Sequence, residues 1–216
     1  MKYPKIQTLW KRDPNNKNRI IPDELSKPEF DNIKTWIFTE KIDGMNTRVT
    51  YKNSIVRFDG RNEDSQIPSN LYAVLSSIFT REKFESSFPP VGDKPAPIEI
   101  VIFGEGYGPK INGGGLYRDD AGFILFDVWI DGWWLDYNNV ADIATKLGIQ
   151  SVPNFGIGTI DVGIGIVKSA PNSMIAKHPK VIEGIVARSY PLVLFRDGDP
   201  LMFKLKVRDY TDLQKV

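Results

Sequence analysis

The stretch from Lys41 to Phe58 reads KIDGMNTRVTYKNSIVRF, and it decides which fold this chain is expected to adopt. Two runs rich in β-branched and aromatic residues, 49–51 and 55–58, flank the turn-forming residues 52–54. This arrangement predicts a β-hairpin. Lys41 therefore stands directly before a turn that leads into a regular element.

The chain on either side of this hairpin alternates strand and helix patterns. Helical spacing of apolar residues predicts a helix within 68–88, with Ser69 as its N-cap, and a second helix over 137–147 that ends at Gly148. One or two helical turns are expected at 173–178. Strands are predicted over 98–103, 123–130, 133–135, 182–188, 192–195 and 201–207. Antiparallel hairpins with helices beside them indicate the α+β class.

Length and composition limit what the protein can be. The 216 residues suit one domain, because domains contain roughly 100–200 residues. We expect a single domain over 1–216, with residues 1–36 as an irregular arm packed on it and a short helix near 23–31. A hydrophobic share of 41% and a charged share of 25% exclude wholesale disorder. The absence of cysteine excludes disulfide scaffolds and thiolate zinc sites, and a single histidine argues against a histidine-rich metal centre.

The sequence carries no membrane or export signal that we recognise. It holds no run of 18 apolar residues, and the first residues, MKYPKIQTLWKRD, lack an apolar core of the kind found in secretory leaders. We therefore expect a cytoplasmic, intracellular protein with no membrane partner. The net charge of +1 predicts neither a strongly basic nor a strongly acidic surface.

A lysine before a turn is usually a solvated charge, and it becomes a nucleophile only when its amine is uncharged. Nearby cations or desolvation favour that state. Lys204 and Lys206 are two residues apart in a predicted strand, so strand alternation places both on one face. This face is either a solvated surface or a cationic surface over a polyphosphate.

Two glutamates stand at predicted strand ends. Glu183 begins one strand, and Glu105 follows another between Gly104 and Gly106. Glycines at such a position let a ligand approach the backbone closely. The segment 104–108 lacks the Gly-Lys-Ser/Thr ending of a phosphate-binding loop and does not open a helix, so it is not one of the common nucleotide fingerprints.

In their order, six short motifs resemble those of the covalent nucleotidyltransferases, the family of DNA ligases, RNA ligases and mRNA capping enzymes. They are Lys41-Ile42-Asp43-Gly44, Gly60-Arg61-Asn62, Phe103-Gly104-Glu105, Leu125-Phe126-Asp127-Val128, Glu183-Gly184-Ile185-Val186 and Lys204-Leu205-Lys206. Together they extend over about three quarters of the chain. The resemblance implies a ligase-type adenylyltransferase (ATP-grasp-like) domain of antiparallel sheets flanked by helices.

The resemblance implies a role for each residue that matches a motif. Lys41 attacks the α-phosphate of a nucleotide and forms a lysyl–nucleotide intermediate, and Glu40 begins the pocket for the base. Lys204 and Lys206 hold the phosphates and stabilise charge in the transition state. Glu183 binds a divalent metal.

Four further residues receive roles from the same resemblance. Arg61 contacts the nucleotide and the acceptor strand, Phe126 stacks on the purine, and Asp43 orients Lys41. Glu105 holds a ribose hydroxyl and is the second candidate metal ligand beside Glu183. Mg²⁺ is the expected ion, with Mn²⁺ as the alternative, because the available ligands are carboxylates and phosphates.

The branch of the family is indicated by sequence details. Segments 40–46 and 104–111 resemble RNA ligases, and the chain looks most like the small single-domain ATP-dependent 5′–3′ RNA ligases related to the vertebrate enzyme. Only ten residues follow Lys206, so we expect no C-terminal OB fold. Many ligases carry an arginine soon after the nucleophile motif; position 46 is asparagine here, and Arg48, on the same strand face, is expected to take that role.

The implied reaction has three steps and uses ATP. ATP adenylylates Lys41, the AMP moves to a 5′-phosphate end of RNA, and a 3′-hydroxyl end then attacks and releases AMP. The expected partner is RNA with these two ends, and the expected state is a monomer. A basic patch on the arm is either an RNA contact or a solubilising surface; it consists of Lys5, Lys11, Arg12, Lys17 and Arg19.

Two other functions remain open at this level. The chain could be the core of a DNA nick-sealing ligase or of a capping-type guanylyltransferase, with a partner chain supplying the module that it lacks. It could also be a degenerate module that binds a nucleotide without chemistry. Retention of Lys41, Glu183, Lys204 and Lys206 together argues against that, since a binder does not need the nucleophile.

Overall fold

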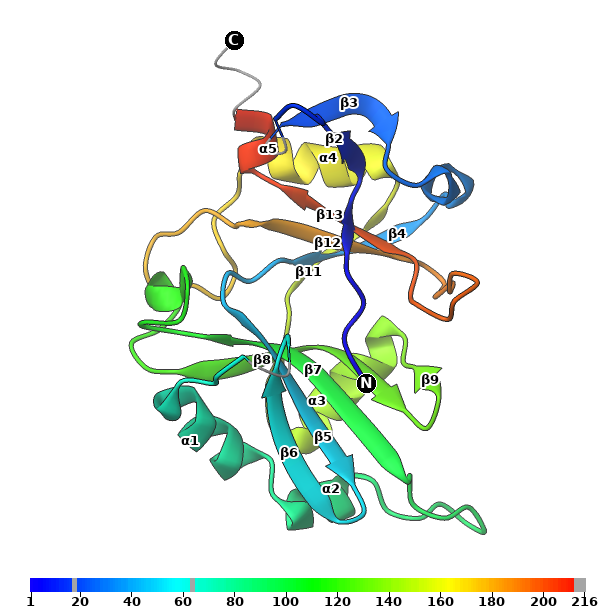
Figure 1. Cartoon of the computed structure of the whole chain (residues 1–216), viewed down its shortest axis with the longest axis vertical. Coiled ribbons are helices and arrows are strands. Elements are labelled where there is room, and N and C mark those ends of the chain that lie inside the picture. The colour runs from blue at the N-terminus through cyan, green and yellow to red at the C-terminus, as the bar shows by residue number, and fades with distance from the viewer. Residues whose placement is uncertain (17–18, 63–64, 212–216) are drawn as a thin grey trace. The chain divides into compact units, whose positions relative to one another are not determined.

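The computed structural model describes residues 1–16, 19–62 and 65–211 and separates the chain into two compact units. Unit 1 consists of Met1–Tyr3 and Asp43–Val152, and unit 2 of Pro4–Ile42 and Pro153–Val216. Each unit has a sheet of mainly antiparallel strands with helices packed against it (Figure 1). The α+β class is therefore confirmed.

Unit 1 is built on a six-stranded sheet. The order is β10-β8-β7-β5-β6, with β9 paired to β8, and every neighbouring pair is antiparallel except β10 with β8. The strands are β5 (Met45–Lys52), β6 (Ile55–Gly60), β7 (Glu99–Tyr107), β8 (Gly122–Ile130), β9 (Trp133–Trp134) and β10 (Gln150–Ser151). The predicted hairpin is confirmed as β5–β6, and Asn53 and Ser54 make its turn with φ of 51° and 61°.

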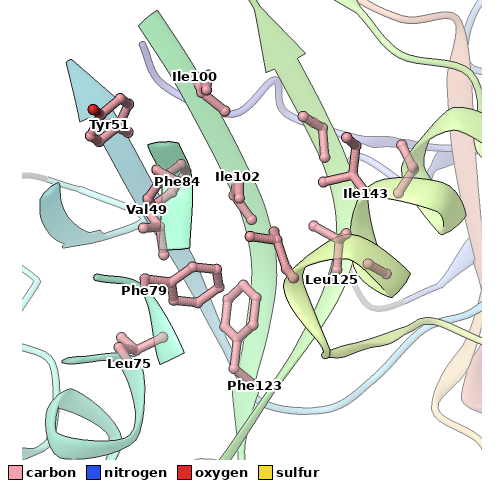
Figure 2. Packing of buried hydrophobic residues seen from close by; sticks show 14 of the residues in the cluster. Val49, Tyr51, Leu75, Phe79, Phe84, Ile100, Ile102, Phe123, Leu125 and Ile143 are labelled. Carbon is pink, nitrogen blue, oxygen red and sulfur yellow. The ribbon is translucent and has the colours of Figure 1, made fainter. Parts of the chain in front are cut away.

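Helices cover one face of this sheet. They are α1 (Ser69–Ile78), α2 (Arg81–Ser87) and α3 (Tyr137–Leu147), and a short 3₁₀ turn, η2, spans Gly114–Leu116. Figure 2 shows Val49, Ile102 and Leu125 from three strands packed against Phe79 and Ile143. Each such side chain contributes roughly 1.5–3 kcal/mol through burial. Alternation along the strands then leaves the opposite face of the sheet for functional side chains.

Capping residues set where the helices of unit 1 begin and end. The apolar pattern of 68–88 is divided into two helices because Thr80 starts a new one, its hydroxyl accepting from the Lys83 N–H at 3.2 Å. Ser69 is the first residue of α1 and makes no side-chain cap. The helix over 137–147 is confirmed with its left-handed glycine, Gly148.

Unit 2 has a five-stranded sheet in the order β1-β13-β12-β4-β11, in which β1 is parallel to β13 and the other pairs are antiparallel. Its strands are β1 (Gln7–Thr8), β4 (Trp36–Glu40), β11 (Asn154–Gly158), β12 (Gly184–Ser189) and β13 (Met202–Lys206). A separate two-stranded sheet pairs β2 (Trp10–Arg12) with β3 (Ile20–Leu25). The helical segments are η1 (Pro28–Asn32), α4 (Ile160–Ser169) and α5 (Arg208–Thr211).

Aromatic residues form the core of unit 2. Trp36 and Phe203 have ring centroids 4.7 Å apart, and Phe38 is fully buried beside α4. Gly163 of α4 lies so close to Phe38 that a Cβ at this position would be 2.6 Å from the Phe38 ring. No helix in the described ranges is both long and apolar enough to cross a membrane.

Several local predictions were wrong. The arm is not irregular throughout, because residues 7–8, 10–12 and 20–25 form β1, β2 and β3, and its short helix lies at 28–32 rather than near 23–31. Residues 173–178 form a loop instead of helical turns, and residues 192–195 contribute only an isolated bridge between Leu194 and Pro200. Helix α4 was not predicted.

These errors have a common cause, since packing outweighs weak local propensity. Helix α4 contains Gly163 and Gly165, which are poor helix formers, and it is stabilised by burial of Val167 in the core of unit 2. Strand β1 of the arm forms at the edge of the unit 2 sheet, where Thr8 pairs with Lys204 of β13, whereas β2 and β3 pair with each other.

Replacing Arg12 is expected to lower the free energy of unfolding by about 3–5 kcal/mol. Its guanidinium makes two hydrogen bonds with Asp209, at 2.9 and 3.0 Å, and the Asp209 side chain is only 2% exposed. Arg12→Ala leaves that carboxylate buried and uncompensated. The matched control is Lys11→Ala, whose exposed pair with Glu24 contributes at most about 1 kcal/mol. Urea unfolding measures both, and equal effects would contradict the assignment.

Candidate active site

The ten site residues expected from the sequence divide equally between the two units. Unit 2 carries Glu40, Lys41, Glu183, Lys204 and Lys206, and unit 1 carries Asp43, Arg48, Arg61, Glu105 and Phe126. Within each unit the neighbouring strands determine which of these side chains meet.

Three adjacent strands bring the unit 2 residues together. Lys41 follows the end of β4, and its N–H donates to the carbonyl of Gly184 at 3.0 Å. Glu183 directly precedes β12, and its carbonyl accepts from the N–H of Val207 at 3.0 Å, just after β13. Because β12 lies between β4 and β13, residues 41, 183 and 206 share one end of the sheet.

The side chains at this end form a compact ionic cluster. The Lys41 Nζ donates to Glu183 Oε2, and the Lys206 Nζ donates to Glu183 Oε1 at 2.5 Å. The three side chains are 23%, 19% and 17% exposed for Lys41, Glu183 and Lys206 respectively. One carboxylate is thus clamped between two ammonium groups and is still accessible to a ligand.

The surroundings of Glu183 act on its pKa in opposite directions. Burial disfavours the carboxylate and on its own would raise the pKa. The charge of Lys41 and the hydrogen bonds from Lys206 and Lys41 outweigh this effect and lower the pKa from its ordinary value. Glu183 is therefore ionised at neutral pH.

This shift predicts an acid-sensitive contribution to stability. A carboxylate whose pKa is lowered by folding stabilises the protein above the unfolded-state value, about 4.3 for glutamate, and this contribution disappears as the pH falls through the lower, folded-state value. Glu183→Gln should therefore differ most from the wild type above about pH 5 and least near pH 3. Chemical denaturation at each pH measures the difference.

The control for this experiment is Glu29→Gln, which changes an exposed glutamate of η1 in the same unit. Its difference from the wild type should be small at every pH. A gap between Glu183→Gln and the wild type that stays constant from pH 7 to pH 3 would show that Glu183 does not act through its charge.

Lys204 lies on the same strand as Lys206 and has the same alternation. Its neighbours Phe203 and Leu205 are 0% and 2% exposed, so the two lysines lie on the opposite face of β13 from the core, as predicted. Across the sheet, Lys204 pairs with Val186 of β12 and with Thr8 of β1. Unit 2 thus gathers three lysines and one carboxylate on one region of its sheet.

Glu40 is the most deeply buried charged residue of the predicted set, at 2% exposure. Its Oε2 accepts from the backbone N–H of Met174 at 3.0 Å, while its Oε1 has no hydrogen-bond partner. Burial raises the pKa of Glu40; the Ser173 hydroxyl, the Met174 N–H and the charge of Lys180 reduce this effect. The side chain presents one buried acceptor atom that the described chain leaves unused.

In unit 1, Glu105 and Arg48 lie on the sheet face opposite the core. Glu105 of β7 pairs with Asn46 of β5, and Arg48 pairs with Phe103, which places both side chains on the same face. Arg48 forms an ion pair with Asp59 at 3.3 Å, and its guanidinium also donates to the carbonyl of Met1. The predicted equivalence of faces at 46 and 48 is thus confirmed.

A β-bulge sets the direction of Phe126. Asp127 and Leu125 face consecutive residues of β7, so Phe126 is the extra residue of β8. Bulges of this kind re-aim a side chain. Phe126 is half-buried, lies outside the core cluster of unit 1 among the described residues, and meets the ring of Tyr3 edge-on with centroids 5.0 Å apart. Tyr3 also donates its hydroxyl hydrogen to Asp127 at 2.8 Å.

The remaining unit 1 residues have simpler surroundings. The Asp43 carboxylate packs against Gly113, where a Cβ would be 1.8 Å from Oδ2, and the Asp43 N–H donates to the Tyr117 hydroxyl at 3.2 Å. Arg61 is exposed directly after β6. Its role in contacting a nucleotide stays a prediction.

The described residues hold few ligands for a metal. They contain no group of three or more histidine, cysteine, aspartate or glutamate side chains positioned to bind one ion. Glu183 and Glu105 belong to different units. The Glu183 carboxylate therefore fits an ion that takes few protein ligands together with substrate phosphates and water, which is the habit of Mg²⁺.

The predicted basic patch on the arm is weakened in the structure. Lys11 forms an ion pair with Glu24, and Arg12 is engaged by Asp209. Lys17 lies outside the described residues. Lys5 and Arg19 make no ion pair among the interactions observed in the described residues, and the role of the patch in RNA contact stays a prediction.

Sequence reasoning missed two supporting groups. The Ser173–Met174 backbone and hydroxyl lie at the Glu40 carboxylate, but they come from a loop that the sequence had predicted as helix. Tyr3, bonded to Asp127, stands in a short polar segment with no motif. A lone aromatic residue in such a segment is a weak signal, and neither position could be found without the fold.

The fold and the ionic cluster are typical of a nucleotidyltransferase. Comparison with known families shows to which family within this class the chain belongs. A family model described as RNA ligase matches residues 34–206. This match covers most of the chain, so the chain belongs to the RNA ligase family. No curated protein matches the sequence.

Solved structures of a Naegleria gruberi RNA ligase have a similar fold. An apo variant has a TM-score of 0.66 at 18% identity and is matched over 100% of this chain and 58% of its own. A variant with ATP and Mn has 0.66 at 17%, over 100% and 59%. A variant with AMP and Mn has 0.62 at 18%, over 99% and 64%. The chain therefore spans about three fifths of the length of these structures.

Proposed function

We propose that this chain catalyses nucleotidyl transfer as an ATP-dependent RNA ligase that joins 5′-phosphate and 3′-hydroxyl ends. The observation that carries the proposal is the cluster of Lys41, Glu183 and Lys206 at one end of the unit 2 sheet. Membership of the RNA ligase family and the ATP-bound state of a similar ligase support the choice of nucleotide.

In the first step the Lys41 amine attacks the α-phosphorus of ATP. A P–N bond forms, the bond to the bridging oxygen breaks, and pyrophosphate leaves. An ammonium group has no lone pair for this attack, so Lys41 must give up a proton before it reacts. Glu183 accepts a hydrogen bond from the Lys41 ammonium and stabilises its positive charge before the nucleotide binds.

Lys204 and Lys206 bind the triphosphate in this proposal. Both project from the solvent-facing side of β13, and a strand fixes them more firmly than a loop would. Their charges attract the incoming anion and stabilise the charge that develops on the leaving pyrophosphate. Removing either lysine should weaken nucleotide binding as well as transfer.

A divalent metal fits Glu183 and the phosphates, since this carboxylate is partly exposed and already ionised. Glu105 is proposed as the second ligand of this ion. It is also proposed to hold a ribose hydroxyl of the nucleotide. The ion would supply charge neutralisation at the phosphates. Mg²⁺ is proposed, and a similar ligase has been solved with Mn.

Glu40 is proposed to read the base. Its buried Oε1 is an acceptor without a partner in the described chain, and such an atom strongly favours a ligand donor. The 6-amino group of adenine is a donor, whereas guanine presents an acceptor at the same position. The acceptor chemistry of Glu40 therefore supports ATP over GTP.

The unit 1 residues are assigned from the family resemblance. Phe126 would stack on the purine, and its re-aimed, half-buried ring supports this role. Arg48 and Arg61 would contact the nucleotide and the RNA, and Asp43 would orient Lys41. In the later steps the RNA 5′-phosphate attacks the lysyl-AMP, and the RNA 3′-hydroxyl then attacks the adenylylated end and releases AMP.

Label transfer tests the proposal. Incubation with α-labelled ATP and Mg²⁺ should leave label on the protein, and a 5′-phosphorylated RNA oligonucleotide should then be circularised or joined. GTP in place of ATP, and nicked duplex DNA in place of RNA, are the comparison arms. Transfer of label from GTP, or joining of DNA alone, would identify a different branch of nucleotidyltransferases. Unlabelled wild-type protein would contradict the proposal altogether.

A further inference from the structure

A closed loop in unit 2 contacts the carboxylate of Glu40. Residues 171–182 return on themselves through a bridge between Asn172 and Val181, and the Ser173 N–H donates to the Lys180 carbonyl at 2.8 Å. The Ile182 N–H closes the base of the loop by donating to the Pro171 carbonyl at 3.0 Å. The 171–182 loop is therefore a fixed structure, although it contains no helix or strand.

This loop binds one oxygen of Glu40 and leaves the other free. The Met174 N–H donates to Oε2 at 3.0 Å, and the Ser173 side chain stabilises the same carboxylate. The Ser173 hydroxyl oxygen also accepts from the Ile175 N–H at 3.3 Å, which fixes the turn that presents Met174. Rotation of the carboxyl group would break these contacts, so Oε1 is held in one direction.

We propose that Ser173 is a positioning residue that sets the preference of this protein for a 6-aminopurine nucleotide, because it holds Glu40 with a single acceptor oxygen free to meet the base. This inference rests on the proposed function, in which Glu40 reads the base. The inference adds a role for Ser173 on the 171–182 loop. It attributes the nucleotide specificity to the contacts that hold the Glu40 carboxylate.

The selectivity of the held Glu40 carboxylate follows from the chemistry of 6-aminopurine and 6-oxopurine nucleotides. A 6-amino group donates a hydrogen bond to the free Oε1, and both partners are then satisfied. A 6-oxo group places an acceptor against an acceptor in a buried position, which leaves both without a donor. Such a mismatch is strongly unfavourable only when the carboxylate cannot turn away or take up a proton.

Ser173 contributes to both conditions. Its hydroxyl fixes the turn that aims the Met174 N–H, so the carboxylate does not turn. It also favours the ionised form of Glu40 against burial, as does the charge of Lys180 on the same loop. A protonated Glu40 could donate to a 6-oxo group, so removal of Ser173 should increase tolerance for that class.

The test compares equilibrium binding of ATP and inosine triphosphate to the full chain by titration calorimetry. Inosine triphosphate carries an oxygen in place of the 6-amino group. The wild type should bind ATP at least about tenfold more tightly. Ser173→Ala should reduce this preference to about threefold or less, through weaker binding of ATP and tighter binding of inosine triphosphate, and Ser173→Thr, which keeps the hydroxyl, should restore it.

Ser169→Ala is the matched control. Ser169 is an exposed serine at the end of α4 whose hydroxyl donates to the Ile166 carbonyl at 2.8 Å, and its removal should leave the preference unchanged. A general loss of structure would weaken binding of both nucleotides equally. Ser173→Ala protein with the wild-type preference, or with an equal loss for both nucleotides, would overturn the inference.

The outcomes separate this inference from the proposed function. Label transfer to the protein together with a preference that does not depend on Ser173 removes the inference alone. A preference that depends on Ser173 without label transfer supports the inference and removes the proposed chemistry. If neither nucleotide binds, both are wrong.

Discussion

Lys41→Ala should abolish covalent labelling by α-labelled ATP, with a loss of at least about 1,000-fold, because the substitution removes the atom that attacks the phosphorus. Lys206, the nearest alternative, is bonded to the other oxygen of Glu183 at 2.5 Å and projects from a different strand.

Lys41→Arg separates chemistry from structure at the same position. Arginine keeps the positive charge and can still pair with Glu183, but its guanidinium does not lose a proton at any pH that proteins tolerate. We expect Lys41→Arg to bind ATP and to remain unlabelled. Lys34→Ala, at an exposed lysine before β4, should label like the wild type.

Gel autoradiography gives the extent of labelling, and calorimetry gives ATP affinity for the same preparations. Label on Lys41→Arg would falsify the assignment of the nucleophile. A variant that fails to bind ATP as well as to accept label would instead indicate that Lys41 serves binding rather than covalent transfer.

The positions of Lys41, Glu183, Lys204 and Lys206 at one region of a sheet could be predicted because the evidence for them is local. Lys204 and Lys206 alternate with apolar residues in a strand, and strand alternation alone placed them on one face. Lys41 and Glu183 stand at strand ends, where a side chain is fixed by the strand without being buried within it. Such positions can be read from a linear pattern.

The surroundings of Glu40 could not be predicted, since they depend on contacts between distant segments. Ser173 and Met174 are more than 130 residues from Glu40 along the chain. The loop that carries them has apolar residues at spacings that also suit helical turns, and only its closure by the Asn172–Val181 bridge excludes that alternative. Helix α4 was missed for the opposite reason, because its glycines conceal a segment that packing makes helical.

Gly184→Ala should reduce the free energy of unfolding by about 3 kcal/mol or more, since it forces a methyl group into backbone. A Cβ on Gly184 would be 2.0 Å from the Leu205 carbonyl oxygen and 2.8 Å from the Lys206 Cα. These atoms belong to β13 and cannot rotate away as a side chain can. Relief requires β12 and β13 to separate at the end that carries Glu183 and Lys206, so ATP labelling should fall together with stability.

Gly165→Ala is the same chemical change with the opposite expectation. Gly165 lies inside α4, and a Cβ there would meet no atom within 4 Å. Alanine reduces the freedom of the unfolded chain at this position and should stabilise the protein by about 0.5–1 kcal/mol. Urea unfolding curves for both variants measure the contrast. If Gly184→Ala proved as stable as the wild type, the close contact of β12 with β13 at Gly184 would not contribute to stability.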